Sequence, residues 1–109
     1  CSFEKKNIKS LIMDFSKKSI DLSSSILKSL GHPIRISIVL SLSNNSQLTV
    51  SELCDRLLVS QPVMSLHLGI LREKKIIAVK KKGKQSLYSI VNHSVNQIVR
   101  VIYNSNISI

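Results

Sequence analysis

Apolar residues recur at intervals of three and four through most of the chain before residue 75, which is the spacing of one face of an α-helix. We expect a first helix over about residues 3–18 and a second that begins at a polar cap among residues 21–25. Gly31 should end the second helix in the left-handed conformation, which costs glycine least. Pro33 should open a third helix, with His32 as its cap.

Residues 49–74 have the pattern of two helices joined by a tight turn. Thr49 and Glu52 have the spacing of a capping box, which starts the first, short helix. A Ser-Gln-Pro start signal at residues 60–62 opens the second. Its buried stripe should be Met64, His67, Leu68 and Leu71, with His67 as a hydrogen-bonded packing residue. We interpret the pair as a helix-turn-helix.

After Lys75 the apolar residues no longer follow the helical spacing, and β-rich runs predict strands over residues 76–80 and 85–91 around a turn at Gly83. Ser94 should cap a last helix with the stripe Val95, Ile98, Val99 and Ile102. We therefore predict a mainly α fold with a small β-hairpin wing, a winged helix-turn-helix with extra terminal helices. Residues 1–109 would form one domain, with residues 1–20 and 93–105 as dimerisation helices.

The net charge of the chain indicates the kind of partner that it binds. The chain has 109 residues with 16 Lys+Arg and 6 Asp+Glu, a formal net charge of +10. Basic residues are concentrated after residue 73, where no acidic residue occurs, and this favours a polyanion such as nucleic acid. No apolar run approaches the about 18 residues of a membrane span, so we expect no membrane partner.

Several motifs occur in one order between residues 26 and 91, and together they resemble the ArsR/SmtB family of bacterial winged-helix repressors. They are Leu30-Gly31-His32-Pro33-x-Arg35-Ile36, Ser51-Glu52-Leu53-Cys54, Ser60-Gln61-Pro62, Ser65-x-His67-Leu68-x-x-Leu71-Arg72 and Lys82-Gly83-Lys84-x-x-x-Tyr88. The resemblance implies a cytoplasmic homodimer that represses transcription and leaves its operator when an effector binds.

A helix-turn-helix reads double-stranded DNA by laying its second helix in the major groove. Gln61 and Ser65 would hydrogen-bond base edges or phosphates, while Val63 and Leu66 would touch thymine methyl groups. Wing lysines would meet phosphates. The residues expected to contact DNA are Ser60, Gln61, Val63, Ser65, Leu66, Arg72, Lys80, Lys81, Lys82 and Lys84, with Arg35 as a less supported addition.

The apolar outward positions leave an alternative open, because members of the family often carry polar or basic residues there. Val63, Leu66 and Ile70 could instead pack on a protein, in a winged-helix module that has lost DNA reading. An enzyme is not expected, since no Gly-rich phosphate loop, nucleophile arrangement or metal-ligand cluster is present. We expect no cofactor.

The sequence leaves the identity of the effector open. The family places metal-binding cysteines on the helix before the recognition helix, and here only Cys54 remains, with Thr49 and Ser51 at the other ligand positions. One thiolate cannot build a soft-metal site, although Cys1 of a partner subunit could supply a second. We expect no metal and interpret Cys54 as a small buried hydrophobe, with an effector or redox role as the weaker alternative. His93 is interpreted as a helix-start residue rather than a ligand.

Overall fold

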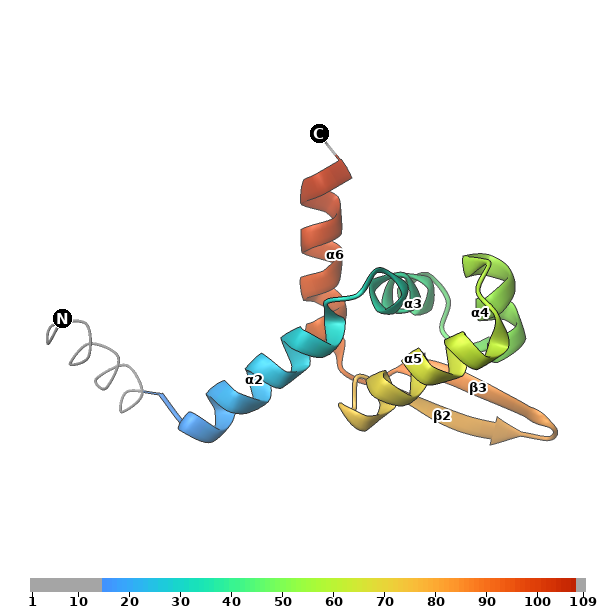
Figure 1. Ribbon diagram of the computed structural model, residues 1–109, viewed down its shortest axis with the longest axis horizontal. Helices are drawn as coiled ribbons and strands as arrows, with labels where there is room; N and C mark the ends of the chain where they lie inside the picture. The colour runs from blue at the N-terminus through green and yellow to red at the C-terminus, as the bar shows by residue number, and fades with distance from the viewer. Residues whose placement is uncertain (1–14, 108–109) are drawn as a thin grey trace, which may run out of the picture.

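The computed structural model describes residues 15–107, and its elements follow in the order of a winged helix-turn-helix (Figure 1). The predicted fold class is therefore confirmed. The elements are α2 (Lys17–Leu30), α3 (Pro33–Asn44), β1 (Leu48–Thr49), α4 (Val50–Leu57), α5 (Gln61–Glu73), β2 (Ile77–Lys82), β3 (Gln85–Ile90) and α6 (His93–Ile107). Among these residues, no helix has the length and apolar character needed to cross a bilayer.

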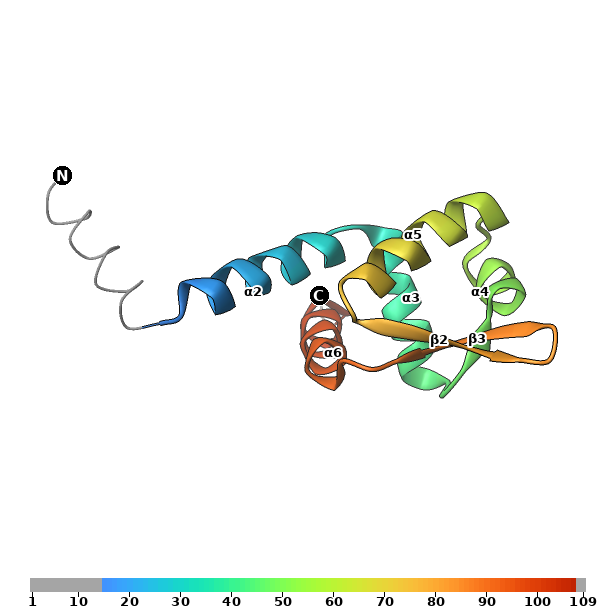
Figure 2. The same cartoon turned by 90° about the horizontal axis from the view of Figure 1, so that it is seen from below.

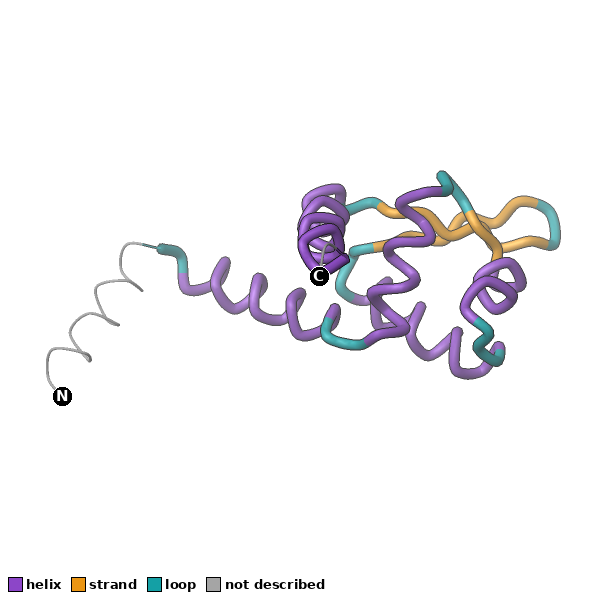
Figure 3. Tube along the Cα trace, turned by 90° about the horizontal axis from the view of Figure 1, so that it is seen from above, coloured by secondary structure: helices purple, strands orange, loops and turns teal. Residues whose placement is uncertain are grey.

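The hydrophobic core lies where α3, α4 and α5 meet each other and the sheet (Figure 3). Aliphatic side chains fill it, because the chain has no Trp and few other aromatics. Removing these side chains from water is the main term that stabilises the fold. The largest fully buried side chains are Ile38, Val39, Leu53, Met64, Leu68, Leu71, Ile76, Ile77 and Val99.

The sheet has three antiparallel strands in the order β1-β3-β2. In the hairpin, Lys82 pairs with Gln85, so the loop is Gly83 and Lys84, and Gly83 takes the positive φ of 65° that favours glycine. The sequence does not predict the third strand, β1, in which Leu48 pairs with Tyr88 of β3. Two residues are too few to give a recognisable alternation in the sequence.

The start of α2 differs from the prediction. Ser16 is its N-cap, and its Oγ accepts a hydrogen bond from the Ser19 N–H at 3.2 Å. Residues 21–25 therefore lie inside the helix, and residues 17–18 belong to α2 instead of the end of an earlier helix. The rest of that expected first helix, residues 3–14, lies outside the described residues.

Two helix ends also need correction. Gly31 does follow α2, but at φ −77° it is not left-handed; its N–H bonds the Lys28 carbonyl, and the chain turns directly into α3. His32 caps α3 as predicted, with Nδ1 accepting from the Ile34 N–H at 3.1 Å. Ser94 does not cap α6, because Asn92 already supplies an oxygen to the Val95 N–H at 3.1 Å.

The outer helices α2 and α6 are only partly covered. Both extend away from the body formed by α3, α4, α5 and the wing (Figures 1 and 2). In α6, Val95 and Val99 of the predicted stripe are buried in the core of this chain, whereas Ile98 and Ile102 of the same stripe remain 44% and 53% exposed. Each outer helix therefore has apolar surface that residues 15–107 leave uncovered.

Candidate nucleic-acid interface

Helix α4, which leads into the turn before α5, is defined at both of its ends. At the start of α4, the Thr49 N–H donates to a Glu52 carboxylate oxygen at 2.9 Å and the Glu52 N–H donates to Thr49 Oγ1 at 3.2 Å, which confirms the capping box. The hydrogen bond from the Thr49 N–H is the main reason that the pKa of Glu52 is lowered. At the end of α4, Leu58 is left-handed at φ 55°, and its side chain is 91% exposed.

Helix α5 has one buried and one open side. Met64, His67, Leu68 and Leu71 are buried, as the sequence predicts. On the open side, Gln61 and Ser65 are exposed, and the apolar Val63 and Leu66 are 41% and 62% exposed. Ser60 is the N-cap but makes no cap hydrogen bond through its side chain. The first N–H groups of α5 are therefore available to an external acceptor.

A polar cluster lies beneath α5 and anchors it to α3. Arg35 Nε donates to His67 Nδ1 at 3.1 Å, and Arg35 Nη1 donates to the Ser29 carbonyl at 2.9 Å. The ring of His32 packs on that of His67, with centroids 4.4 Å apart. Arg35 thus makes internal contacts, which favours a structural role over its interpretation as a further phosphate contact. His67 is the packing histidine that was predicted.

The environment of His67 favours the neutral ring. Only 6% of the residue is exposed, and burial is the main cause that lowers its pKa. The nearby His32 and Arg35 lower it further, since a positive charge there would repel an imidazolium. A neutral ring can accept the hydrogen bond from Arg35 through Nδ1.

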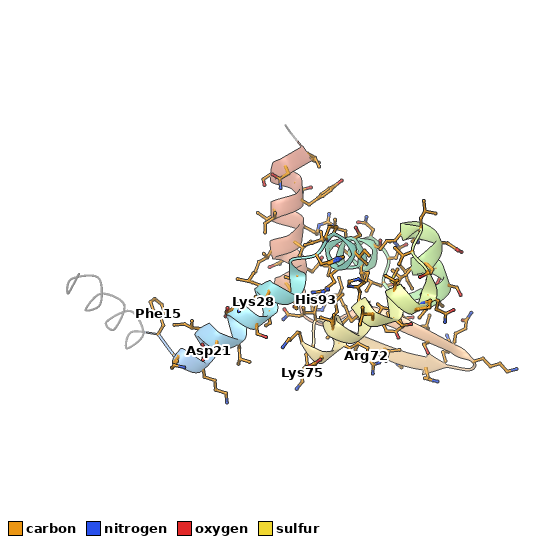
Figure 4. All side chains as sticks on the ribbon, in the orientation of Figure 1. Phe15, Asp21, Lys28, Arg72, Lys75 and His93 are labelled. Carbon is orange, nitrogen blue, oxygen red and sulfur yellow. The ribbon has the colours of Figure 1, made fainter. Side chains whose placement is uncertain are left out.

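The end of α5 directs the chain into the wing. Lys75 is left-handed at φ 58°; its N–H donates to the Arg72 carbonyl at 2.9 Å, and the Ile76 N–H donates to the Leu71 carbonyl at 3.0 Å. This pair of bonds is the Schellman arrangement, here with lysine where glycine is usual. Figure 4 shows Arg72 and Lys75 together at this end of α5. Neither Leu58 nor Lys75 has a sequence signal for left-handed backbone.

The basic side chains of the wing are exposed to solvent. All of Lys80, Lys81, Lys82 and Lys84 are exposed. The start of α5 adjoins the wing, because Gln61 lines one groove with Lys84, Gln85 and Ser86. The ten residues expected to contact DNA are therefore all exposed, and they come from α5, its N-cap and the wing.

The described residues give little support to a metal site. Cys54 is half-buried and packs against the core, consistent with a small hydrophobe. Within residues 15–107, no group of three or more His, Cys, Asp or Glu side chains could hold a metal ion. His93 is the first residue of α6, as expected, and Cys1 lies outside the described range.

Comparison with known proteins agrees with this geometry. Residues 32–79 match the model of the family described as "Bacterial regulatory protein, arsR family". The HTH-type transcriptional repressor SmtB of Mycobacterium tuberculosis is 37% identical over 83 residues, which cover 76% of this chain and 61% of SmtB. The biofilm growth-associated repressor of Xylella fastidiosa is 31% identical over 90 residues, which cover 83% of this chain and 77% of that protein.

Solved structures give the same result. HlyU from Vibrio cholerae superposes with a TM-score of 0.76 at 26% identity, covering 84% of this chain and 98% of HlyU. The transcriptional repressor BigR from Xylella fastidiosa superposes with a TM-score of 0.75 at 30% identity, covering 83% of this chain and 91% of BigR. With the same helix order, the same wing and these sequence matches, the chain belongs to the arsR family of bacterial regulatory proteins.

Proposed function

We propose that this chain is a sequence-specific DNA-binding repressor that acts as a homodimer on a palindromic operator in the cytoplasm. The observation that carries the proposal is the joint exposure of the open side of α5 and the four wing lysines. A helix of this size fits the major groove, and a basic hairpin beside it can follow the phosphates. The names of the relatives describe repressors, and the proposal includes no catalytic step.

The homodimer is inferred from uncovered apolar side chains on the outer helices. Val101, Ile102 and Tyr103 of α6 are 67%, 53% and 47% exposed, and Leu22 and Leu27 of α2 are 56% and 55% exposed. Several large apolar side chains left exposed on one helix are typical of a protein interface. Two-fold pairing would place the two α5 helices about 34 Å apart, one turn of DNA, which explains the expected palindrome.

DNA binding is tested by selecting sequences from a random duplex pool and titrating the best one at several salt concentrations. We expect an enriched palindrome whose affinity falls steeply with salt. In a dimer, Lys81→Ala with Lys82→Ala removes four charges, which should reduce the salt slope by up to about 3.6. The control is Lys17→Ala with Lys18→Ala, the same loss of charge on α2, which should leave the slope unchanged. Absence of enrichment would refute the operator.

The homodimer is tested by sedimentation at several concentrations. Ile102→Lys places a charge in the proposed interface and should shift the chain to monomer. Leu58→Lys makes the same kind of change at a residue that is 91% exposed on the α4–α5 turn, and it should leave the dimer intact. A monomeric wild-type chain would contradict the proposal.

The exposed Val63 and Leu66 are a feature that would also suit a protein-interaction module. The relatives do not favour it, since they are named as repressors. Salt-insensitive binding to a protein, with no affinity for any duplex, would establish that alternative. The same DNA titrations, repeated with thiol-reactive metals and oxidants, would test whether Cys54 takes part in release of the operator.

A further inference from the structure

We propose that Val63 and Leu66 determine operator specificity by packing against the C5-methyl groups of thymines, an inference that rests on the proposed DNA-binding function. The two residues are three positions apart on α5, so both lie on the same side of the helix, away from the buried Met64 and His67. Exposed apolar side chains on a helix that adjoins a basic hairpin have no core to fill. In the major groove, the matching apolar feature of a base pair is the thymine methyl group.

Apart from Ser65, whose hydroxyl can bond any base, the remaining side chains in the first half of α5 lack the paired donors that read guanine. Guanine is read through O6 and N7 by the paired donors of Arg or by Lys, and the first basic residue of α5 is Arg72, in its last turn. Arg72 is six residues beyond Leu66, about 9 Å along the helix axis. Gln61, at the start of the helix, has the amide that pairs with adenine N6 and N7. The reading half of α5 therefore has chemistry for A·T base pairs.

Gly69 supplies a separate observation on the same side of α5. Glycine inside a helix is unfavourable compared with alanine, and here a Cβ at residue 69 would meet no other part of the described structure within 4 Å, apart from the adjoining turns of its own helix. Packing within the protein thus gives no reason for glycine at this position. A close approach to an external surface does, because Gly69 follows Leu66 by one turn and leaves the helix backbone uncovered there.

Charge complementarity identifies duplex DNA as the occupant of this face. Lys80, Lys81, Lys82 and Lys84 of the wing and Arg72 at the end of α5 are all exposed, and Gln61 and Lys84 line one groove where the start of α5 adjoins the wing. The exposed acidic residue of α5 is Glu73, its last residue. A protein partner for such a surface would need to be strongly acidic and apolar together. The major groove provides both properties, with phosphates along its edges and thymine methyl groups within it.

The test removes single methyl groups from DNA. In the palindrome selected from the random pool, each thymine is replaced in both half-sites by deoxyuridine, which lacks only the C5-methyl. Burial of one such methyl group corresponds to about a fourfold change in affinity. When every contacted thymine is replaced, a dimer loses four contacts, two for each α5, and binding should weaken on the order of 100-fold. Replacing thymines outside the site should have no effect.

Protein variants then assign the contacts. In the Val63→Ala and Leu66→Ala variants, replacing the thymine that the lost side chain contacts should no longer weaken binding. The control variant Ser65→Ala, on the same helix, should remain as sensitive to deoxyuridine as the wild-type protein. An enriched palindrome with no deoxyuridine-sensitive position would overturn this inference and leave the proposed function standing. Sensitivity that persists in both apolar variants would also overturn it. A pool without enrichment would refute the proposed function, and this inference with it.

Discussion

Replacing Arg35 with alanine should destabilise the fold while leaving the electrostatics of DNA binding unchanged. Its guanidinium donates to His67 Nδ1 at 3.1 Å and to the Ser29 carbonyl at 2.9 Å, so it joins α3 to α5 and to the end of α2. The substitution leaves both acceptors without this donor, and both acceptor residues are buried. A buried acceptor without a partner costs more than the hydrogen bond itself contributes.

The magnitude follows from the two contacts. A hydrogen bond from a charged group contributes about 1.5–3 kcal/mol, and Arg35 is half-buried, so the lower value applies to each. We therefore expect Arg35→Ala to lower the free energy of unfolding by about 3 kcal/mol. For a domain of this size, 1 kcal/mol corresponds to about 4 °C in Tm, so Tm should fall by about 12 °C.

The matched control is Arg72→Ala, which removes the same side chain from an exposed position. Its stability should change by less than about 0.5 kcal/mol, and the salt slope of DNA binding should fall by up to about 1.8 in a dimer. Thermal unfolding and salt-dependent anisotropy of both variants give the comparison. An unchanged Tm for Arg35→Ala, together with a salt slope lowered as in Arg72→Ala, would refute the internal role of Arg35.

Three further predictions concern single residues of the helix-turn-helix. Leu58→Gly should raise the free energy of unfolding by about 1 kcal/mol, because it relieves left-handed backbone at an exposed side chain; Leu58→Ala, which keeps a Cβ, should not. Acidification from pH 7 to 5.5 should lower Tm, since the lowered pKa of His67 means that the unfolded chain binds the proton first; a His67→Gln variant with an equal decrease would contradict this cause. Gly69→Ala should stabilise α5 by about 1 kcal/mol yet weaken operator binding, and unchanged affinity would exclude close approach of the helix to DNA.

The local elements of this protein could be predicted from its sequence because their signals are local. The capping box at Thr49 and Glu52, the buried stripe of α5 and the hairpin at Gly83 each depend on residues within a few positions of one another. The basic wing is likewise a property of four lysines close together in the chain. The ordered motifs indicate the arsR family from the sequence alone, because they depend on residue type and order and not on contacts.

Tertiary structure decided the features that depend on residues distant in the chain. Arg35 and His67 are 32 positions apart, and only the packing of α3 against α5 turns a proposed phosphate contact into an internal hydrogen bond. Strand β1 exists because Leu48 meets Tyr88, and the left-handed backbone at Leu58 and Lys75 follows from how α5 must be positioned at each end. Sequence determined which residues could read DNA; packing determined which of the arginines remained free to do so, because an arginine already bound inside the protein cannot also contact a phosphate with the same donors.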